Sequence, residues 1–284
     1  MKSVLLLFAV SVLIHAQANT AALQQQIAQD FEKMKSSDAN QRIAAFDDIA
    51  SIGCPSCNHS AQPILDGIES AIHSGAVTHD DMSARLIALL TTEAAYDTKI
   101  QDAFDKSGAS IAPENYYDYI GDLIMAVVHM RDPRSLNALM YFIDSGNMAT
   151  SAIASFGDAA LEQVLPLIDS PIRQSHFGHR SGLRHPAYTV LSKMVEAKNL
   201  QNFSDPPAAR AKIKDRLMTA AGSEPDIWAR QAAITGLGTL GDPDAVALLQ
   251  RIVDTDTTPD LQGRPGRNLV REEAQRALSK AKKP

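Results

Sequence analysis

Three segments of the chain share one spacing of apolar residues, and this spacing constrains the fold more than any other feature. In each segment apolar side chains recur at i, i+3, i+4 and i+7, which places them on one face of an α-helix. The segments are Leu136 to Ile143, Leu161 to Ile168 and Ala245 to Ile252. No stretch of comparable length alternates apolar and polar residues as a half-buried β-strand does. The sequence therefore predicts an all-α protein. The side chains expected in its core are Leu136, Leu139, Met140, Ile143, Leu161, Val164, Leu165, Ile168, Leu237, Leu248, Leu249 and Ile252.

A similar turn precedes each of the three segments. Aspartate is a good N-cap because its carboxylate accepts hydrogen bonds from the first turn, and proline fits the first helical position because its missing N–H is not needed there. Another helical run precedes each turn, and the run from Ile227 to Leu240 starts after Ser223 and Asp226, whose spacing is typical of a capping box. The turns are Arg131-Asp132-Pro133, Gly157-Asp158-Ala159 and Gly241-Asp242-Pro243. The pattern predicts helical hairpins in tandem, which bury their apolar faces by stacking.

The residues from Ile227 to Leu249 resemble a HEAT repeat of the short, phycobilisome-lyase-like type. They combine a charged residue and an alanine pair in the first helix, a Gly-Asp turn, and a second helix ending in Leu-Leu. The segment from Gln41 to Gly53 is similar to another first helix. The resemblance implies a right-handed α-solenoid, also described as an ARM-type superhelix, of about six to eight helical pairs. It also implies a concave face that binds a ligand, lined by second helices with Arg134 and Asn137 on the exposed side of one of them, and it implies no reaction.

The first 18 residues are typical of a signal peptide. Lys2 provides the positive charge, an apolar run follows from Val4 to Ile14, and Ala16-Gln17-Ala18 offers small residues for cleavage. We therefore expect an exported protein, periplasmic or extracellular, whose mature chain begins near Asn19. No later stretch of the sequence is long and apolar enough to suggest a membrane span.

Charge is unevenly distributed along the expected mature chain. Residues 19–170 hold 8 basic and 21 acidic residues, whereas residues 171–284 hold 18 basic and 12 acidic residues. Such a chain can meet an anionic partner through its C-terminal half, or associate head to tail with itself, unless the difference only reflects solvated surfaces. The acidic balance and the expected export argue against a nucleic-acid partner.

The two cysteines form the sequence Cys54-Pro-Ser-Cys57. In an exported protein the pair is expected to be oxidised, so we predict a structural disulfide across a turn. Two alternatives remain open: a redox pair at the start of a helix, and a zinc site that adds His59 and one distant ligand.

The segment from Arg173 to His185 interrupts the helical pattern as a polar insertion at about residues 171–186. It holds three arginines and three histidines without an acidic residue. We expect an exposed loop or short broken helix, and three interpretations apply: a solvated insertion, a site for an anionic ligand or a partner, and a metal site using imidazoles. The candidate binding residues are Arg173, His176, His179, Arg180, Arg184 and His185.

Motifs that would indicate an enzyme are missing or out of context. Gly236-Leu-Gly-Thr-Leu-Gly241 matches a dinucleotide-binding fingerprint, but the run before it is helical rather than a strand, so we interpret its last glycine as part of a turn between helices. No zinc-protease, nucleophile-elbow or phosphate-loop motif occurs, and no cofactor or resident metal is predicted.

These observations favour an exported, non-enzymatic protein-interaction scaffold that binds a partner protein. Two alternatives are kept: an enzyme or enzyme accessory that uses the segment 173–185 or the Cys54/Cys57 pair, and a self-associating structural solenoid.

Overall fold

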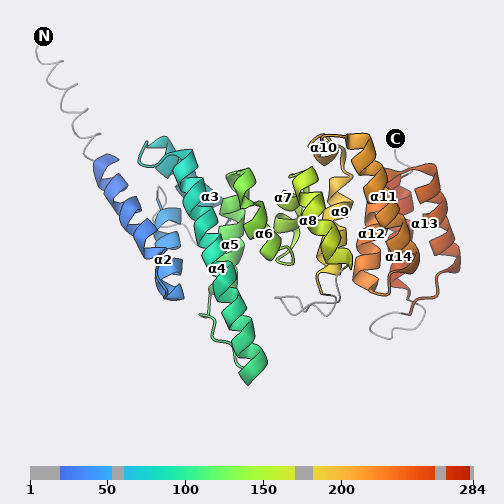
Figure 1. The fold of residues 1–284 in the computed structure, drawn as a ribbon, viewed down its shortest axis with the longest axis horizontal. Coiled ribbons are helices and arrows are strands. Elements are labelled where there is room, and N and C mark those ends of the chain that lie inside the picture. Colours follow the sequence, from blue (N-terminus) through green and yellow to red (C-terminus); the bar gives the residue numbers. More distant parts are fainter. Residues whose placement is uncertain (1–19, 53–60, 170–181, 260–266, 282–284) are drawn as a thin grey trace, which may run out of the picture. The chain divides into compact units, whose positions relative to one another are not determined.

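A computed structural model of the chain describes residues 20–52, 61–169, 182–259 and 267–281. Within these ranges all regular structure is helical and no residue is in a β-strand, so the all-α prediction is confirmed (Figure 1). Helices that are neighbours in sequence pack on one another, as in a HEAT-type α-solenoid. The chain divides into two compact units, Met1–Ala138 and Leu139–Pro284.

The first unit is built from a helical stretch at 20–33 and four further helices. These are α2 (Ala39–Ala50), α3 (Ala61–His73), α4 (His79–Ser107) and α5 (Tyr116–His129). Helix α2 packs on α3, and α5 packs on both α3 and α4. The 29-residue helix α4 begins at the N-cap Thr78, whose hydroxyl accepts a hydrogen bond from the N–H of Asp81, and it ends at Gly108 in a left-handed conformation.

A charged pair lies in the core of this unit. The side chains of Arg42 on α2 and Glu93 on α4 are 2% and 0% exposed. The Arg42 guanidinium binds both carboxylate oxygens of Glu93, and its Nη1 donates to the carbonyl of Ser36 at 2.9 Å. The Tyr119 hydroxyl donates to Glu93 Oε1 at 3.1 Å. Burial, followed by the Glu93 carboxylate, raises the pKa of Tyr119, so its hydroxyl stays a donor.

The turn at Asp132 follows the predicted capping pattern. The Asp132 carboxylate accepts from the N–H of Arg134 at 2.9 Å at the head of the short 3₁₀ helix Pro133–Ser135, where Pro133 takes the first position. Ser83 on α4 donates to the same carboxylate at 2.6 Å. Hydrogen bonds from the Arg134 side chain and from Ser83 lower the pKa of Asp132 despite its burial. Helix α6 (Leu136–Tyr141) follows directly, at the division between the units.

The second unit stacks its helices in two layers. The first layer holds α7 (Asn147–Ala154), α9 (Arg184–Met194), α12 (Ile227–Leu240) and α14 (Leu269–Ala281). Each of these four packs on the next in that order, and the contacts of α12 with α9 and α14 are the most extensive in the unit. The second layer holds α8 (Asp158–Asp169), α11 (Pro206–Ser223) and α13 (Pro243–Thr255), with the single-turn α10 (Ala197–Leu200) between α9 and α11. Figure 1 shows α11 to α14 side by side at the C-terminal end of the unit.

Two glycines allow the helices of the first layer to approach closely. A Cβ atom on Gly238 of α12 would lie 2.7 Å from the Cβ of Ala277 on α14, and one on Gly236 would lie 3.1 Å from the Cα of Ser192 on α9. Gly241 has φ +64° and caps α12 at its C-terminus. The three glycines of the apparent dinucleotide fingerprint therefore serve helix packing and the turn between helices. The turn predicted at Gly241 is confirmed.

The predicted core residues are buried with one exception. Met140 is only half-buried, although Leu139 before it and Ile143 after it are fully enclosed. The other eleven lie at 9% exposure or less.

Local capping also differs from three expectations. Asp158 is the first residue of α8 rather than its N-cap, and its carboxylate accepts from the N–H of Ser204 at 2.8 Å. Ser223 ends α11 rather than starting α12, so the expected capping box is wrong, and Asp226 itself caps α12 by accepting from the N–H of Trp228 at 2.9 Å. Asp242 occupies the N-cap of α13 but makes no capping bond, because its carboxylate instead binds the guanidinium of Arg210 at 2.6 Å. The capping signal is local, and tertiary partners compete for the same carboxylate.

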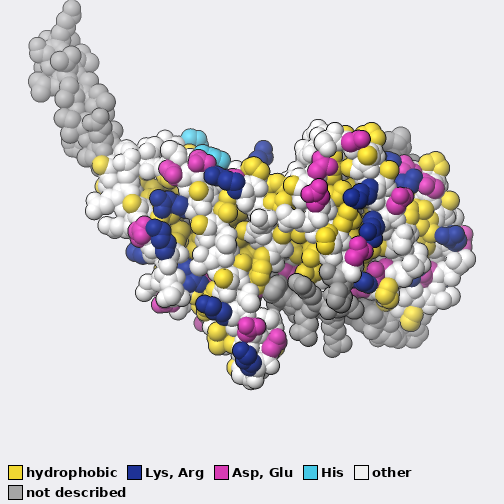
Figure 2. Space-filling view, viewed as in Figure 1, with side chains coloured by type: hydrophobic (Ala, Val, Ile, Leu, Met, Phe, Trp, Pro, Cys, Tyr) yellow, Lys and Arg dark blue, Asp and Glu magenta, His cyan; other side chains and the backbone are white. Residues whose placement is uncertain are grey.

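Charged side chains of opposite sign alternate over the visible surface of the second unit (Figure 2). On α11, Arg216 binds Asp169 at 3.0 Å and Lys214 binds Asp244 at 2.7 Å. Hydrogen bonds from Arg210 and Lys214 lower the pKa of Asp242. The basic excess of the C-terminal half is thus partly neutralised by pairing between neighbouring helices.

Candidate functional site

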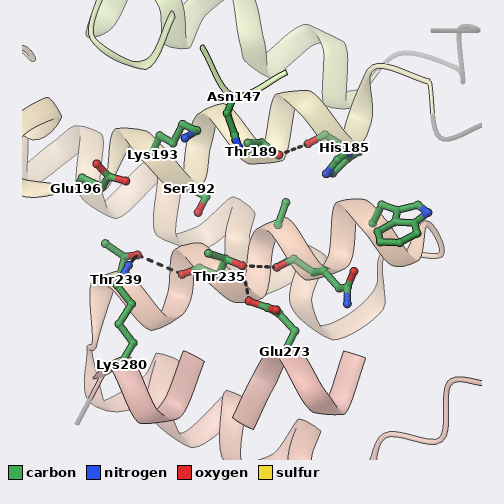
Figure 3. A pocket seen from close by; sticks show the side chains of 13 residues that line it. Asn147, His185, Thr189, Ser192, Lys193, Glu196, Thr235, Thr239, Glu273 and Lys280 are labelled. Atoms are coloured by element: carbon green, nitrogen blue, oxygen red, sulfur yellow. Dashed lines mark hydrogen bonds between the residues drawn. The ribbon is translucent and has the colours of Figure 1, made fainter. Parts of the chain in front are cut away.

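A hollow of about 280 Å³ opens over the first layer of the second unit, and we call it the polar groove (Figure 3). Its lining comes from the exposed faces of α7, α9, α12 and α14, with Glu196 just beyond α9. The residues that line it are Asn147, His185, Thr189, Ser192, Lys193, Glu196, Trp228, Gln231, Ala232, Thr235, Thr239, Glu273 and Lys280.

Helical spacing explains how these side chains share one surface. On α12 the lining positions are 228, 231, 232, 235 and 239, and on α9 and the residues after it they are 185, 189, 192, 193 and 196. Residues three or four apart lie on the same face of a helix. The opposite faces of α9 and α12 are buried in the unit, with Leu191 and Leu237 fully enclosed. The groove is therefore the part of the first layer that packing leaves uncovered.

Threonine hydroxyls supply much of the groove's polar surface. The Thr189 hydroxyl donates to the carbonyl of His185 at 3.0 Å, and the Thr239 hydroxyl donates to that of Thr235 at 3.2 Å. The Thr235 hydroxyl lies 3.0 Å from the carbonyl of Gln231 and 2.7 Å from Oε1 of Glu273 on α14. A hydroxyl that donates inward keeps lone pairs to accept from a ligand. Figure 3 shows these side chains on facing helices around the hollow.

The chain's single tryptophan borders the groove. Trp228 is 49% exposed although it lies in the first turn of α12, whose start is fixed by the Asp226 cap. A large aromatic side chain left exposed in a hollow is a common anchor for a partner, because it offers a wide apolar face and one N–H donor.

A smaller hollow of about 210 Å³ adjoins the polar groove and shares Asn147, His185 and Thr189 with it. Its remaining lining comes from Pro186 and from the turn and first residues of α7, including Thr150. His185 therefore lies on the boundary between two hollows, in the first turn of α9.

The structure describes two of the six residues predicted from the Arg/His segment. His185 lines both hollows. Arg184 is turned toward the protein: its Nε donates to the carbonyl of Ile168 at 3.1 Å, and its Nη1 lies 3.3 Å from Oε1 of Glu224. It thereby joins the end of α8 to the turn before α12. Both residues belong to α9, so the expected loop ends before Arg184.

The remaining predicted site residues lie outside the described part of the chain. These are Arg173, His176, His179 and Arg180, together with Cys54 and Cys57. Their proposed roles in ligand binding and in a disulfide stay predictions. Among the residues that the structure describes, no group of three or more His, Cys, Asp or Glu side chains is arranged to hold a metal ion. In the same ranges, no helix combines the length and apolar character needed to cross a bilayer.

Most of the polar groove was not predicted from the sequence. The signal that exists is the run of positions 228, 231, 235 and 239 on one face of a helix whose other positions are small or apolar. Every surface helix has such a polar face, so the pattern alone does not select this one. The ligand-binding face was expected on the second helices of the pairs, whereas this hollow lies over the first helices.

Comparison with known proteins gives one family match. Residues 181–279 match the family of HEAT repeats, a range that contains α9 to α13, most of α14, and all lining residues of the polar groove except Asn147 and Lys280. The C-terminal part of the chain therefore carries HEAT repeats, as the residues quoted above predicted. No curated protein matches the chain. Among solved structures, it is similar to the crystal structure of an engineered protein at 17% identity and a TM-score of 0.40, with 92% of this chain and 98% of that chain covered.

Proposed function

We propose that this protein is an exported, non-enzymatic interaction scaffold that holds a segment of another protein in the polar groove. Stacked HEAT repeats present an extended surface and suit protein binding. Export is inferred from the pattern of residues 1–18, and the short, phycobilisome-lyase-like repeat type from the segment Ile227 to Leu249.

The observation that carries the proposal is the exposure of Trp228 at a hollow with a hydroxyl- and amide-rich lining. Residues that carry most of the binding energy at protein interfaces are enriched in tryptophan and are surrounded by contacts that contribute little energy but exclude water. A half-exposed indole costs free energy in water, and a partner's apolar side chain would remove that cost. The hydroxyl and amide groups beside it match the donors and acceptors of a peptide backbone.

A binding assay with matched variants tests the proposal. Thr235→Arg places a long charged side chain in the groove. Thr219→Arg is the control, because Thr219 is also an exposed helical threonine whose hydroxyl bonds the carbonyl four residues earlier at 3.0 Å, but it lies on α11 in the other layer. Both variants should fold. Only Thr235→Arg should lose partners recovered by crosslinking from the exported fraction.

Trp228 provides an independent readout, since no other tryptophan contributes to the emission. A purified partner should shift that emission to shorter wavelength as the indole leaves water. Equal recovery with both threonine variants and an unchanged emission would refute the groove as the binding surface. Recovery of the protein itself, together with a concentration-dependent size, would instead support the self-associating alternative.

A further inference from the structure

We infer that the polar groove selects a peptide segment bearing carboxylates, and that Lys193 and Lys280 bind them. This inference rests on the proposed function and adds the chemistry of the segment. It follows from how the charged side chains in and around the groove are paired.

Two lysines lie at one end of the groove. Lys193 is near the C-terminus of α9 and Lys280 is near the C-terminus of α14. Figure 3 shows both side chains at the end opposite His185, on either side of the hollow. The Lys280 ammonium donates to the Thr239 hydroxyl at 3.0 Å, which holds it toward α12.

The two groove carboxylates are paired with cations that do not line the groove. Glu273 binds Arg276 at 2.8 Å and also lies 2.7 Å from the Thr235 hydroxyl. Glu196 binds Lys198 at 3.1 Å. Each acid therefore has its charge compensated from outside.

The two lysines have no such compensation within the described part of the chain. No carboxylate there lies within 4.0 Å of the ammonium of Lys193 or Lys280. On α11, by contrast, Arg210, Lys214 and Arg216 all bind aspartates. An ammonium has three donors, so both lysines retain donors for a ligand. The end of the groove marked by these lysines is consequently cationic, and a carboxylate is its complement.

The distance between the two ends sets the length of the segment. Trp228 and Thr239 are separated by eleven residues of one helix, or about 16 Å along its axis at 1.5 Å per residue. An extended chain rises about 3.3 Å per residue, so about five residues cover that distance. We expect an apolar side chain on Trp228 and one or two carboxylates, from Asp, Glu or a chain end, about four or five residues away.

Three short peptides with blocked ends test this chemistry. They share a leucine at one end and differ only at the other, which carries Glu-Glu, Gln-Gln or Lys-Lys. None contains tryptophan, so Trp228 emission reports binding to the full-length protein, and fluorescence polarisation of labelled peptides gives the affinities.

The Glu-Glu peptide should bind about tenfold more tightly than the Gln-Gln peptide, from about threefold for each exposed ion pair. That difference should fall with rising salt and vanish in the double variant Lys193→Gln/Lys280→Gln. The double variant Lys193→Glu/Lys280→Glu should instead prefer the Lys-Lys peptide. Lys212→Gln is the matched control, because Lys212 is an exposed lysine on α11 and should leave all three affinities unchanged.

The outcomes separate this inference from the proposed function. Equal binding of the three peptides, with loss on Thr235→Arg, would keep the groove as a peptide site and overturn its preference for acids. The same conclusion follows if Lys212→Gln weakens the Glu-Glu peptide as much as the groove variants do. Failure of every peptide to change Trp228 emission overturns the inference, and the partner recovery described above then decides the proposed function separately.

Discussion

Replacing the buried pair Arg42 and Glu93, singly and together, tests whether the two charges stabilise the first unit only as a pair. Each side chain is at most 2% exposed and each is the other's main partner. Arg42→Met leaves a buried carboxylate whose remaining side-chain donor is the Tyr119 hydroxyl. Glu93→Leu leaves a buried guanidinium that retains only its bond to the Ser36 carbonyl and the face of the Tyr96 ring, 5.0 Å away.

The expected free energies follow from these leftover groups. Leaving one member of a buried ion pair without its partner costs about 3–5 kcal/mol, so each single variant should lose that much stability. The double variant leaves no charge behind and exchanges the pair for apolar side chains of similar volume. Its main loss is the Tyr119 hydroxyl's acceptor, at about 1–3 kcal/mol. The two single effects are therefore far from additive, and the coupling free energy should be about 3 kcal/mol or more.

Urea unfolding followed by far-ultraviolet circular dichroism measures the cycle, and hydrogen exchange of the α2 and α4 amides locates its effect. Emission from Trp228, which lies in the second unit, should change little at low urea. The exposed pair Lys35 and Glu32, 2.6 Å apart and more than half exposed, is the control, and its cycle should show no measurable coupling. Single variants that lose less than about 1 kcal/mol, or a double variant equal to their sum, would refute the reasoning.

Two further predictions concern close packing and acid. Gly238→Ala should destabilise the protein by about 1–2 kcal/mol, since overpacking against Ala277 outweighs the gain in helix propensity. Gly121→Ala, with no atom within 4 Å of the added Cβ, should instead stabilise it by about 0.5–1 kcal/mol. Thermal melts of both variants measure the difference, and equal effects would contradict the reasoning. The pKa of Asp132 is lowered in the folded state, so its contribution to folding stability is present above the ordinary carboxyl pKa of about 4 and is lost as pH falls below it. Asp132→Asn should therefore flatten the decline of melting temperature with falling pH in that range. An unchanged decline would contradict this role of Asp132.

The parts of the fold that could be predicted are those that local sequence determines. Three apolar stripes and their turns indicated the hairpins, and Ile227–Leu240 was predicted with the bounds that the structure gives. Prediction was wrong where a tertiary partner competes. Asp242 has the residue type and position of a cap, yet its carboxylate binds Arg210 on a helix about thirty residues earlier, which no local pattern reveals.

The candidate site could be predicted only in part, for a related reason. A stretch rich in Arg and His and free of acid is visible in sequence, and it led to His185, which does line the groove. The same pattern predicted Arg184 as a binding residue too, but its guanidinium binds the carbonyl of Ile168 and the carboxylate of Glu224. Whether a cation is available to a ligand depends on which acids fold against it, as the contrast between Lys193 and Arg216 also shows.

Helix α12 shows how a repeat of this kind can separate folding from recognition. It contacts α9, α14, α11 and α13, so most of its positions are restricted to small or apolar residues, and at Gly236 and Gly238 even a methyl group would collide with a neighbour. The narrow face left over holds Trp228, Thr235 and Thr239. Substitutions at Thr235 or Thr239 remove an exposed hydrogen bond to α14 but leave the close packing at Gly236 and Gly238 in place, and surface changes away from buried contacts usually alter stability little. Ligand preference can therefore change at these positions without a change of fold. Gly238→Ala is expected to lose stability and Thr235→Arg is expected to lose binding, so the two variants measure the two roles separately.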